Sequence, residues 1–364
     1  MTTTVNNKSE VVQSGTTISI DAMGGDLGPA AIVAGIVRVA QKNKRIHFLL
    51  HGQEEQLRKL VAKRLSLKGR VTIIDSVEVI KMEDKPSHVV RHGKATSMWS
   101  AIDSVRNGNA SVCVSCGNTG ALMAISMVRL RKLNGVNRPA IAILWPSSNP
   151  MGFNVMLDVG ADVRADPKDL LQYALMGVSY ARNGLGIAKP RVGLLNVGTE
   201  EHKGRSELKE AYSKIEHCQL EANFVFEGFV EGGDIPGSKV DVIVTDGFTG
   251  NVALKTAEGT ASLIGYLLRE AFRFSPLSKL ASILAFTSLN RFKMRIDPRR
   301  VNGGVFLGLN GTVVKSHGSA DATGIEAAIK LAFELSKNDF LQKVAARVAY
   351  AGAIDNDVCD DENK

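Results

Sequence analysis

Long apolar runs, cysteines and aromatic residues are all scarce in this chain of 364 residues. No window reaches the roughly 18 consecutive apolar residues that a membrane-spanning helix needs. The polar segment 1–15 lacks the apolar centre of a secretory signal. With only four cysteines in the chain, these absences lead us to expect a cytoplasmic protein.

Two of the cysteines, Cys113 and Cys116, have the CxxC spacing of some redox and zinc sites. They lie in the run 110–116, which is typical of a buried strand, where alternate side chains face opposite sides. The two side chains are therefore predicted to point apart. No second CxxC and no histidine cluster accompany them, so we predict that the chain has no metal site.

The residues that are abundant favour a globular protein with many tight turns. Hydrophobic residues make up 44% of the chain and charged residues 23%, which argues against disorder and supplies one large core or two joined lobes. The 35 glycines suit an α/β enzyme with tight loops at the strand ends. The formal net charge of +8 allows an acidic partner, nucleic acid or an anionic membrane.

Short β-branched runs alternate with helical stretches, which favours a mostly parallel sheet covered on both faces. The predicted strands are Thr17–Met23, Ile46–His51, Val71–Ile74, Ser111–Ser115, Ala140–Trp145, Val155–Asp158, Val192–Asn196 and Val240–Thr245. The predicted helices are Pro29–Lys42, Glu54–Leu65, Thr96–Arg106, Thr119–Lys132, Pro167–Asn183, Ser206–Glu216, Thr249–Ala271, Ala320–Lys337 and Asp339–Tyr350.

The domain organisation has two readings. The turn-rich segment 147–150 can be a hinge between lobes, or the chain can be one compact unit with an inserted helical pair. We expect a disordered segment 1–15, a single α/β domain over 16–351 with an amphipathic helical insertion near 265–300, and an acidic tail over 352–364.

Six turns rich in glycine and small polar residues are predicted at strand ends, where ligands of open α/β sheets bind. Glycine after a strand is often only a requirement of the turn, but six such turns in one chain suggest a binding site for an anion. They are 20–29, 115–120, 157–162, 195–204, 244–251 and 311–321. We expect them to gather at one rim of the sheet. The chain has neither GxxxxGK[ST] nor a GxGxxG after the first strand, which disfavours P-loop nucleotide enzymes and dinucleotide dehydrogenases.

Side chains in these turns suit the binding of phosphate or of an oxyanion. Ser115, Asn118 and Thr119 can donate hydrogen bonds to anionic oxygens. Lys315 and His317 can neutralise negative charge, and on a strand their spacing of two would place both on one side.

Three of the candidate side chains also have a structural interpretation. His317 can equally make a hydrogen bond to a nearby loop. Asp158 and Asp246 can orient catalytic groups or simply cap their loops.

In this order, the six turns resemble those of the bacterial phosphate acyltransferase family, and the resemblance covers roughly residues 17–351. Cys116 is a departure, because the family often has alanine there. The motifs that carry the resemblance are IDAMGGD (20–26), SCGNTGALMA (115–124), LDVGAD (157–162), LLNVGTEEHKG (194–204), TDGFTGNVALKTAEG (245–259) and GTVVKSHGSAD (311–321).

The resemblance implies a three-layer α/β/α Rossmann-like sandwich, related to phosphotransacetylases and isocitrate-dehydrogenase-like enzymes. It also implies a homodimer without metal or nucleotide cofactor. The implied reaction converts long-chain acyl-[acyl-carrier-protein] and inorganic phosphate to acyl-phosphate and free carrier protein. The product then feeds a membrane glycerol-3-phosphate acyltransferase of phospholipid synthesis. The alternatives are a short-chain phosphotransacetylase, a hydroxy-acid dehydrogenase and a non-catalytic membrane scaffold for lipid-synthesis enzymes.

The resemblance and the turn chemistry together yield a set of candidate residues. The candidate catalytic residues are Asn118, Asp246, Lys315 and His317. The candidate phosphate- or substrate-binding residues are Asp21, Gly24, Gly25, Asp26, Ser115, Gly117, Thr119, Asp158, Asn196, Gly198, Asn251 and Ser319. We place phosphate near Gly24, Gly25, Asn118 and Thr119, with Lys315 and His317 stabilising charge.

The segment 265–300 combines apolar positions at helical spacing with basic flanks. It can be a core or dimer-interface helix, an amphipathic helix on anionic lipid, or a docking surface for acyl carrier protein, which is acidic as a class. Its candidate contact residues are Leu277, Lys279, Leu280, Leu284, Arg291 and Lys293. Because the positive charge lies beside apolar residues rather than stacking aromatics, we predict no nucleic-acid binding.

Overall fold

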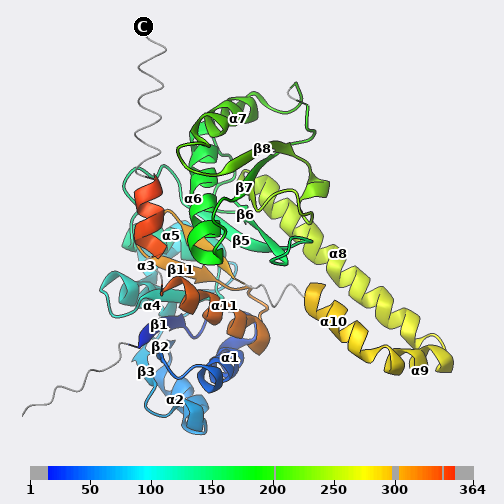
Figure 1. The fold of residues 1–364 in the computed structure, drawn as a ribbon. Coiled ribbons are helices and arrows are strands. Elements are labelled where there is room, and N and C mark those ends of the chain that lie inside the picture. The colour runs from blue at the N-terminus through cyan, green and yellow to red at the C-terminus, as the bar shows by residue number, and fades with distance from the viewer. Residues whose placement is uncertain (1–14, 201, 297–302, 338–339, 349–364) are drawn as a thin grey trace, which may run out of the picture.

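The computed structural model in Figure 1 describes residues 15–200, 202–296, 303–337 and 340–348. Its strands are β1 (Thr16–Asp21), β2 (Ile46–Gly52), β3 (Val71–Asp75), β4 (Val112–Ser115), β5 (Ala140–Pro146), β6 (Phe153–Leu157), β7 (Arg191–Leu195), β8 (Val225–Val230), β9 (Val242–Val244), β10 (Gly304–Leu307) and β11 (Thr312–Lys315). Its α-helices are α1 (Gly28–Lys42), α2 (Glu54–Ala62), α3 (Pro86–His92), α4 (Ser97–Arg106), α5 (Thr119–Arg129), α6 (Pro167–Leu185), α7 (Ser206–Cys218), α8 (Gly247–Arg273), α9 (Pro276–Leu284), α10 (Phe286–Ile296) and α11 (Ala322–Leu335).

The strands form one sheet in the order β3-β2-β1-β4-β11-β10-β5-β6-β9-β7-β8. Pairing is parallel from β3 through β11 and again from β6 through β8. The three junctions between these blocks, β11–β10, β10–β5 and β5–β6, are antiparallel. The prediction of a mostly parallel sheet is therefore confirmed, but the second parallel block runs in the opposite direction to the first.

Helices cover both faces of the sheet, which makes the predicted three-layer sandwich. Residues of α1, α6, α7 and α11 join strand residues such as Val314 and Leu157 in one buried cluster. Residues of α4, α5 and the first half of α8 join Val313 and Phe306 in the other cluster. Cys113 belongs to the second cluster and Cys116 to the first. The prediction that the two thiols point apart is thus confirmed.

Several helices, α6 among them, begin at a residue whose side chain caps the first turn. The Asp166 carboxylate accepts a hydrogen bond from the Asp169 backbone N–H, Asp169 returns one, and Pro167 occupies the first helical turn of α6. That helix ends at Gly186 with φ of 75°, a left-handed conformation that glycine adopts without steric cost. These local contacts fix both ends of α6.

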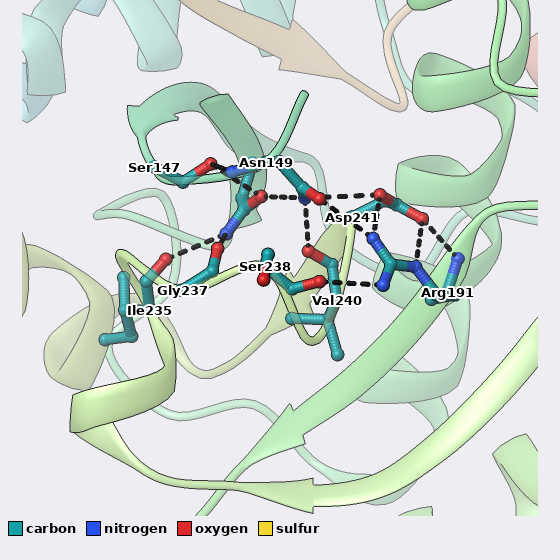
Figure 2. A network of polar contacts seen from close by, with 9 residues as sticks. Ser147, Asn149, Arg191, Ile235, Gly237, Ser238, Val240 and Asp241 are labelled. Carbon is teal, nitrogen blue, oxygen red and sulfur yellow. Dashed lines mark hydrogen bonds and ion pairs between the residues drawn. The ribbon is translucent and has the colours of Figure 1, made fainter. Parts of the chain in front are cut away.

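The segment 147–150, considered above as a hinge, lies in the turn between β5 and β6, which pair as antiparallel neighbours. Figure 2 shows the polar network that holds it. The buried Asn149 side chain donates to Asn154 Oδ1 at 2.5 Å and to the Val240 carbonyl at 2.8 Å. Arg191 donates to Asn149 Oδ1 at 2.9 Å and pairs with Asp241 at 2.8 Å. These contacts tie the turn to the neighbouring strands β7 and β9.

The second half of α8, together with α9 and α10, forms an arm that projects from the sheet (Figure 1). Within the 27 residues of α8 only Gly247 and Gly250 are buried, and α9 has no buried residue. The reading of this segment as a core helix is therefore wrong. No helix among the described residues is long and apolar enough to cross a bilayer.

Candidate active site

The candidate site begins with three polar side chains at the ends of adjacent parallel strands. Ser115 on β4 lies in register with Asp21 on β1 and with Lys315 on β11. All three residues are buried. Because parallel strands end at the same edge of a sheet, the turns that follow these three strands are brought together.

Glycines allow these turns to interlock. A side chain at Gly24 would place its Cβ 2.6 Å from Asp21 Oδ2 and 2.8 Å from the Gly117 backbone nitrogen. Gly25, with φ of 98°, lies equally close to Cys116 and to the Gly318 carbonyl oxygen. The Asp26 backbone N–H donates to that same carbonyl at 2.8 Å. The sequence therefore needs glycine here for close backbone approach as well as for the turn.

Burial shifts the pKa values of two charged side chains where these turns meet. Burial lowers the pKa of Lys315 to about 8, against 10.5 for an ordinary lysine. Its ammonium group donates to the backbone carbonyls of Ser316 and, at 3.4 Å, Cys116. Burial raises the pKa of Asp21, although Ser97 and Ser115 donate to its carboxylate at 2.6 and 2.7 Å.

A cavity of about 540 Å³ opens beside Lys315, within the range of small-molecule sites. Its polar end includes Thr119 and the 315–318 segment. Its walls come from β5, β10 and α8, and many of them are apolar. The apolar wall residues are Met82, Ile141, Ile143, Leu144, Trp145, Pro146, Val159, Leu254, Ala257 and Ala261.

His317 and two residues of α8 form an ionic group on the cavity wall. His317 Nε2 lies 2.7 Å from Glu258 Oε1, and Lys255 Nζ lies 2.9 Å from Glu258 Oε2. Burial alone would raise the pKa of Glu258, but the hydrogen bonds from His317 and Lys255 outweigh it and lower that pKa. The strand β11 ends at Lys315, so His317 lies in the following turn, yet both residues line the cavity.

The Asn118 side chain, predicted as a catalytic donor, has structural partners. Its Oδ1 accepts from the Ala121 backbone N–H at 3.0 Å and so caps α5. Its Nδ2 donates to the carbonyl oxygens of Met82 and Asp84 at 2.7 and 3.0 Å. Asn118 thus ties the start of α5 to the segment before α3, and Thr119, the first residue of α5, is the one that lines the cavity.

The expectation that all six turns meet at one rim is wrong, because β6, β9 and β7 run opposite to β1, β4 and β11. Asp158, after β6, accepts four backbone N–H groups, from Ile141 and the 160–162 turn. Asp246, after β9, caps α8 through the Thr249 N–H and pairs with Arg205. Both carboxylates therefore have structural partners.

Of the remaining candidate residues, some lie at the cavity or in the turns beside it and others lie after strands of the second parallel block. Asn251, on the first turns of α8, lines the cavity. Asn196 and Gly198 follow β7, and Asn196 donates to the Lys203 carbonyl at 3.2 Å. Asp26 and Ser319 belong to the interlocked turns but are exposed.

The cavity roof is the face of α8 that lines the cavity, and Asn251 was the only one of its residues among the sequence candidates. With Leu254, Glu258 and Ala261 it follows a spacing of three or four residues, so these residues form one face of α8. That spacing was visible in the sequence, but nothing local to it indicated that the face lies over a strand a hundred residues earlier. Among the described residues no cluster of His, Cys, Asp and Glu could hold a metal ion.

The arm presents its apolar candidates to solvent. Leu277, Leu280 and Leu284 are 75%, 53% and 80% exposed. Lys279 and Arg291 are exposed on the same arm, and the side chain of Lys293 lies outside the described part of the chain. The three leucines form an uncovered apolar surface within the chain.

The chain has highly similar relatives among known proteins. Residues 16–343 match the family model described as "Fatty acid synthesis protein". The chain is 68% identical over 340 residues to "Phosphate acyltransferase" of Ruegeria pomeroyi, covering 93% of this chain and 92% of the relative. It is 66% identical over 339 residues to the protein of the same name from Paracoccus denitrificans, with the same coverage.

Solved structures with the same fold include phosphotransacetylases. A phosphotransacetylase from Streptococcus pyogenes matches with a TM-score of 0.57 at 18% identity, covering 89% of this chain and 94% of that one. A branched-chain phosphotransacylase from Enterococcus faecalis matches with a TM-score of 0.56 at 12% identity, covering 89% and 99%. At these identities the likeness concerns the fold alone.

Proposed function

Because this chain belongs to the bacterial phosphate acyltransferase family, we propose that it transfers a long-chain acyl group from acyl carrier protein to inorganic phosphate. The chain is an acyltransferase by its family. The identity of the acyl donor, and a role of the product in glycerol-3-phosphate acylation, are our proposals. One observation supports the transfer of an apolar acyl group to phosphate: a buried lysine stands at the end of a cavity whose walls are largely apolar.

The polar end suits phosphate. Lys315 supplies a positive charge in a site of low dielectric, where an ion pair with phosphate is stronger than in water. Thr119 begins α5, and the N–H groups of a first helical turn attract anions. Ser316 and His317 add further polar groups to the same wall.

The reaction requires few groups from the protein. A phosphate oxygen forms a bond to the thioester carbonyl carbon, and the carbonyl oxygen becomes an oxyanion. Lys315 stabilises this developing charge. The oxyanion then re-forms the carbonyl double bond as the carbon–sulfur bond breaks, and the carrier thiolate leaves and takes, through water, the proton that the phosphate group gives up. Holding phosphate in line with the carbonyl supplies much of the rate enhancement.

The test supplies hexadecanoyl-acyl carrier protein and radiolabelled phosphate, and follows the label into a product soluble in organic solvent while free thiol is released. We expect label and thiol in equal amounts. Lys315→Met should lower turnover by about 10² or more, as loss of one preorganised donor does. Lys59→Met is the matched control, because Lys59 is 73% exposed and pairs with Glu55 away from the cavity.

Three results would contradict the proposal. Turnover of Lys315→Met within twofold of wild type would remove the lysine from the mechanism. Turnover with acetyl-CoA alone would favour a short-chain phosphotransacetylase. No turnover combined with vesicle binding would favour a membrane scaffold.

We assign the arm to contacts with partners. Its exposed leucines and neighbouring basic side chains suit an anionic membrane, the acidic carrier protein or the second subunit of a homodimer. Flotation with anionic vesicles distinguishes membrane binding from binding to the carrier protein or to a second subunit. Leu284→Glu should abolish lipid binding, whereas Leu65→Glu, at another exposed leucine, should not. Binding that persists in Leu284→Glu would remove the lipid reading.

A further inference from the structure

A row of seven residues crosses neighbouring strands on the sheet face that carries α4, α5 and α8. Register places these residues opposite one another from β1 to β9, and the ideal Cβ of the β10 member lies 3.6 Å from the β5 member. In order they are Asp21, Ser115, Lys315, Gly304, Ile143, Met156 and Ile243.

The chemistry of this row changes at Gly304. On one side are the three polar side chains of the strand ends, and on the other side the apolar side chains of β5, β6 and β9. Gly304 has no side chain, so nothing from β10 separates Lys315 from Ile143. The two residues lie two strand spacings apart, about 10 Å. A Cβ at Gly304 would reach Ile141 Cγ2 at 2.9 Å.

The side chains of α8 that form the roof of the cavity are also small near its middle. The helix α8 presents Leu254, Ala257 and Ala261 to the cavity. Ala257 is next to Glu258, which contacts His317 at the polar end. One turn earlier, Leu254 borders the cavity together with Val159 and Gly160. Small residues on roof and floor therefore leave an apolar trench that starts at Lys315 and is bounded by Leu254.

We propose that the acyl chain lies in this trench, across β10 and β5 and beneath α8, and that Ala257 and Leu254 determine which chain lengths the enzyme accepts. The thioester carbonyl then lies beside Lys315, over the gap left by Gly304. This inference rests on the proposed phosphorolysis of an acyl thioester. It assigns the discrimination between substrates to residues that take no part in the chemistry.

The test compares kcat/KM for acetyl, octanoyl and hexadecanoyl thioesters of carrier protein, with phosphate at saturation. Ala257→Leu fills the middle of the trench from the roof. We expect kcat/KM for hexadecanoyl to fall at least tenfold, while that for the shortest thioester accepted by the wild type stays within twofold. Gly259→Ala is the matched control, because it adds one methyl group to the same helix with no atom within 4 Å.

Leu254→Ala tests the other end of the trench. It should raise the ratio of hexadecanoyl to octanoyl kcat/KM several-fold, because the bounding side chain becomes shorter. Thermal melting of each variant establishes that it is folded. The inference is overturned if folded Ala257→Leu loses activity equally with all chain lengths or with none, or if Leu254→Ala leaves the ratio unchanged. Failure of the wild type with every thioester would instead refute the proposed function itself.

Discussion

If Lys315 binds phosphate as proposed, its lowered pKa should make that binding sensitive to pH in a range where an ordinary lysine would not titrate. Burial brings this pKa to about 8. The experiment therefore changes only the pH, from 7 to 9, and needs no substitution. If only the ammonium form binds phosphate, affinity must fall as Lys315 loses its proton.

The magnitude follows from the pKa. With a pKa of about 8, roughly nine-tenths of Lys315 is protonated at pH 7 and roughly one-tenth at pH 9. The KM for phosphate should therefore rise about tenfold between these values. A lysine with the ordinary pKa of 10.5 would stay almost fully protonated over this range, and its KM would hardly change. Cys116 does not interfere, because burial raises the pKa of its thiol to about 11.

The assay measures initial rates of thiol release at varied phosphate, with the concentration of phosphate dianion calculated at each pH. Lys315→Arg supplies the comparison, because a guanidinium keeps its charge over the whole range. Whatever activity that variant retains should show a flat KM profile. A wild-type KM that changes by less than twofold from pH 7 to 9 would refute the role of the buried ammonium.

Three further predictions concern stability and the candidates with structural partners. Lys315→Met removes an ammonium whose folded pKa of about 8 lies below the ordinary 10.5. Between those two pKa values the unfolded chain binds more protons than the folded chain, so wild-type stability rises with pH. In urea titrations the variant should therefore have up to about 3 kcal/mol more unfolding free energy than the wild type at pH 7. Above pH 10.5 it should show no gain. Asn149→Ala removes the side-chain donor to the Val240 carbonyl and one of the two donors to Asn154 Oδ1, the other being Ser147. It should cost about 2–4 kcal/mol in the same titration; a loss below 1 kcal/mol would mean that the network in Figure 2 adds little to stability. Asp246→Asn keeps a good helix cap and should keep kcat within twofold, whereas a tenfold loss would assign the carboxylate a role in charge stabilisation.

Much of the fold was accessible from the sequence, because its signals are local. Apolar runs, glycine turns and capping residues predicted eight of the strands and most of the long helices at nearly their observed bounds. The strands β8, β10 and β11 were missed. β8 and β10 each contain a glycine, Gly228 and Gly304, which weakens a strand pattern. β11 has only four residues and lies inside the segment 311–321 that was predicted as a turn.

The site was only half accessible, because periodicity carries no information about strand direction. The turns after β1, β4 and β11 meet as expected, while those after β6, β9 and β7 belong to strands that run the other way. Side-chain roles were ambiguous for a similar reason. Asn118 and Asp246 are residue types that suit both an anion site and a helix cap, and the structure uses both side chains as caps.

The reversal of strand direction across β10, β5 and β6 has a chemical consequence for the middle of the sheet. If all strands ran in one direction, polar turns would line one edge of the sheet from end to end. An apolar substrate would then have no apolar surface beside the anion. Because the direction reverses, Lys315 at the end of β11 is level with Gly304, Ile143 and Met156 on β10, β5 and β6 rather than with further strand ends. A molecule with one charged end and a long apolar chain can therefore contact polar and apolar residues of the same sheet within a few strand spacings.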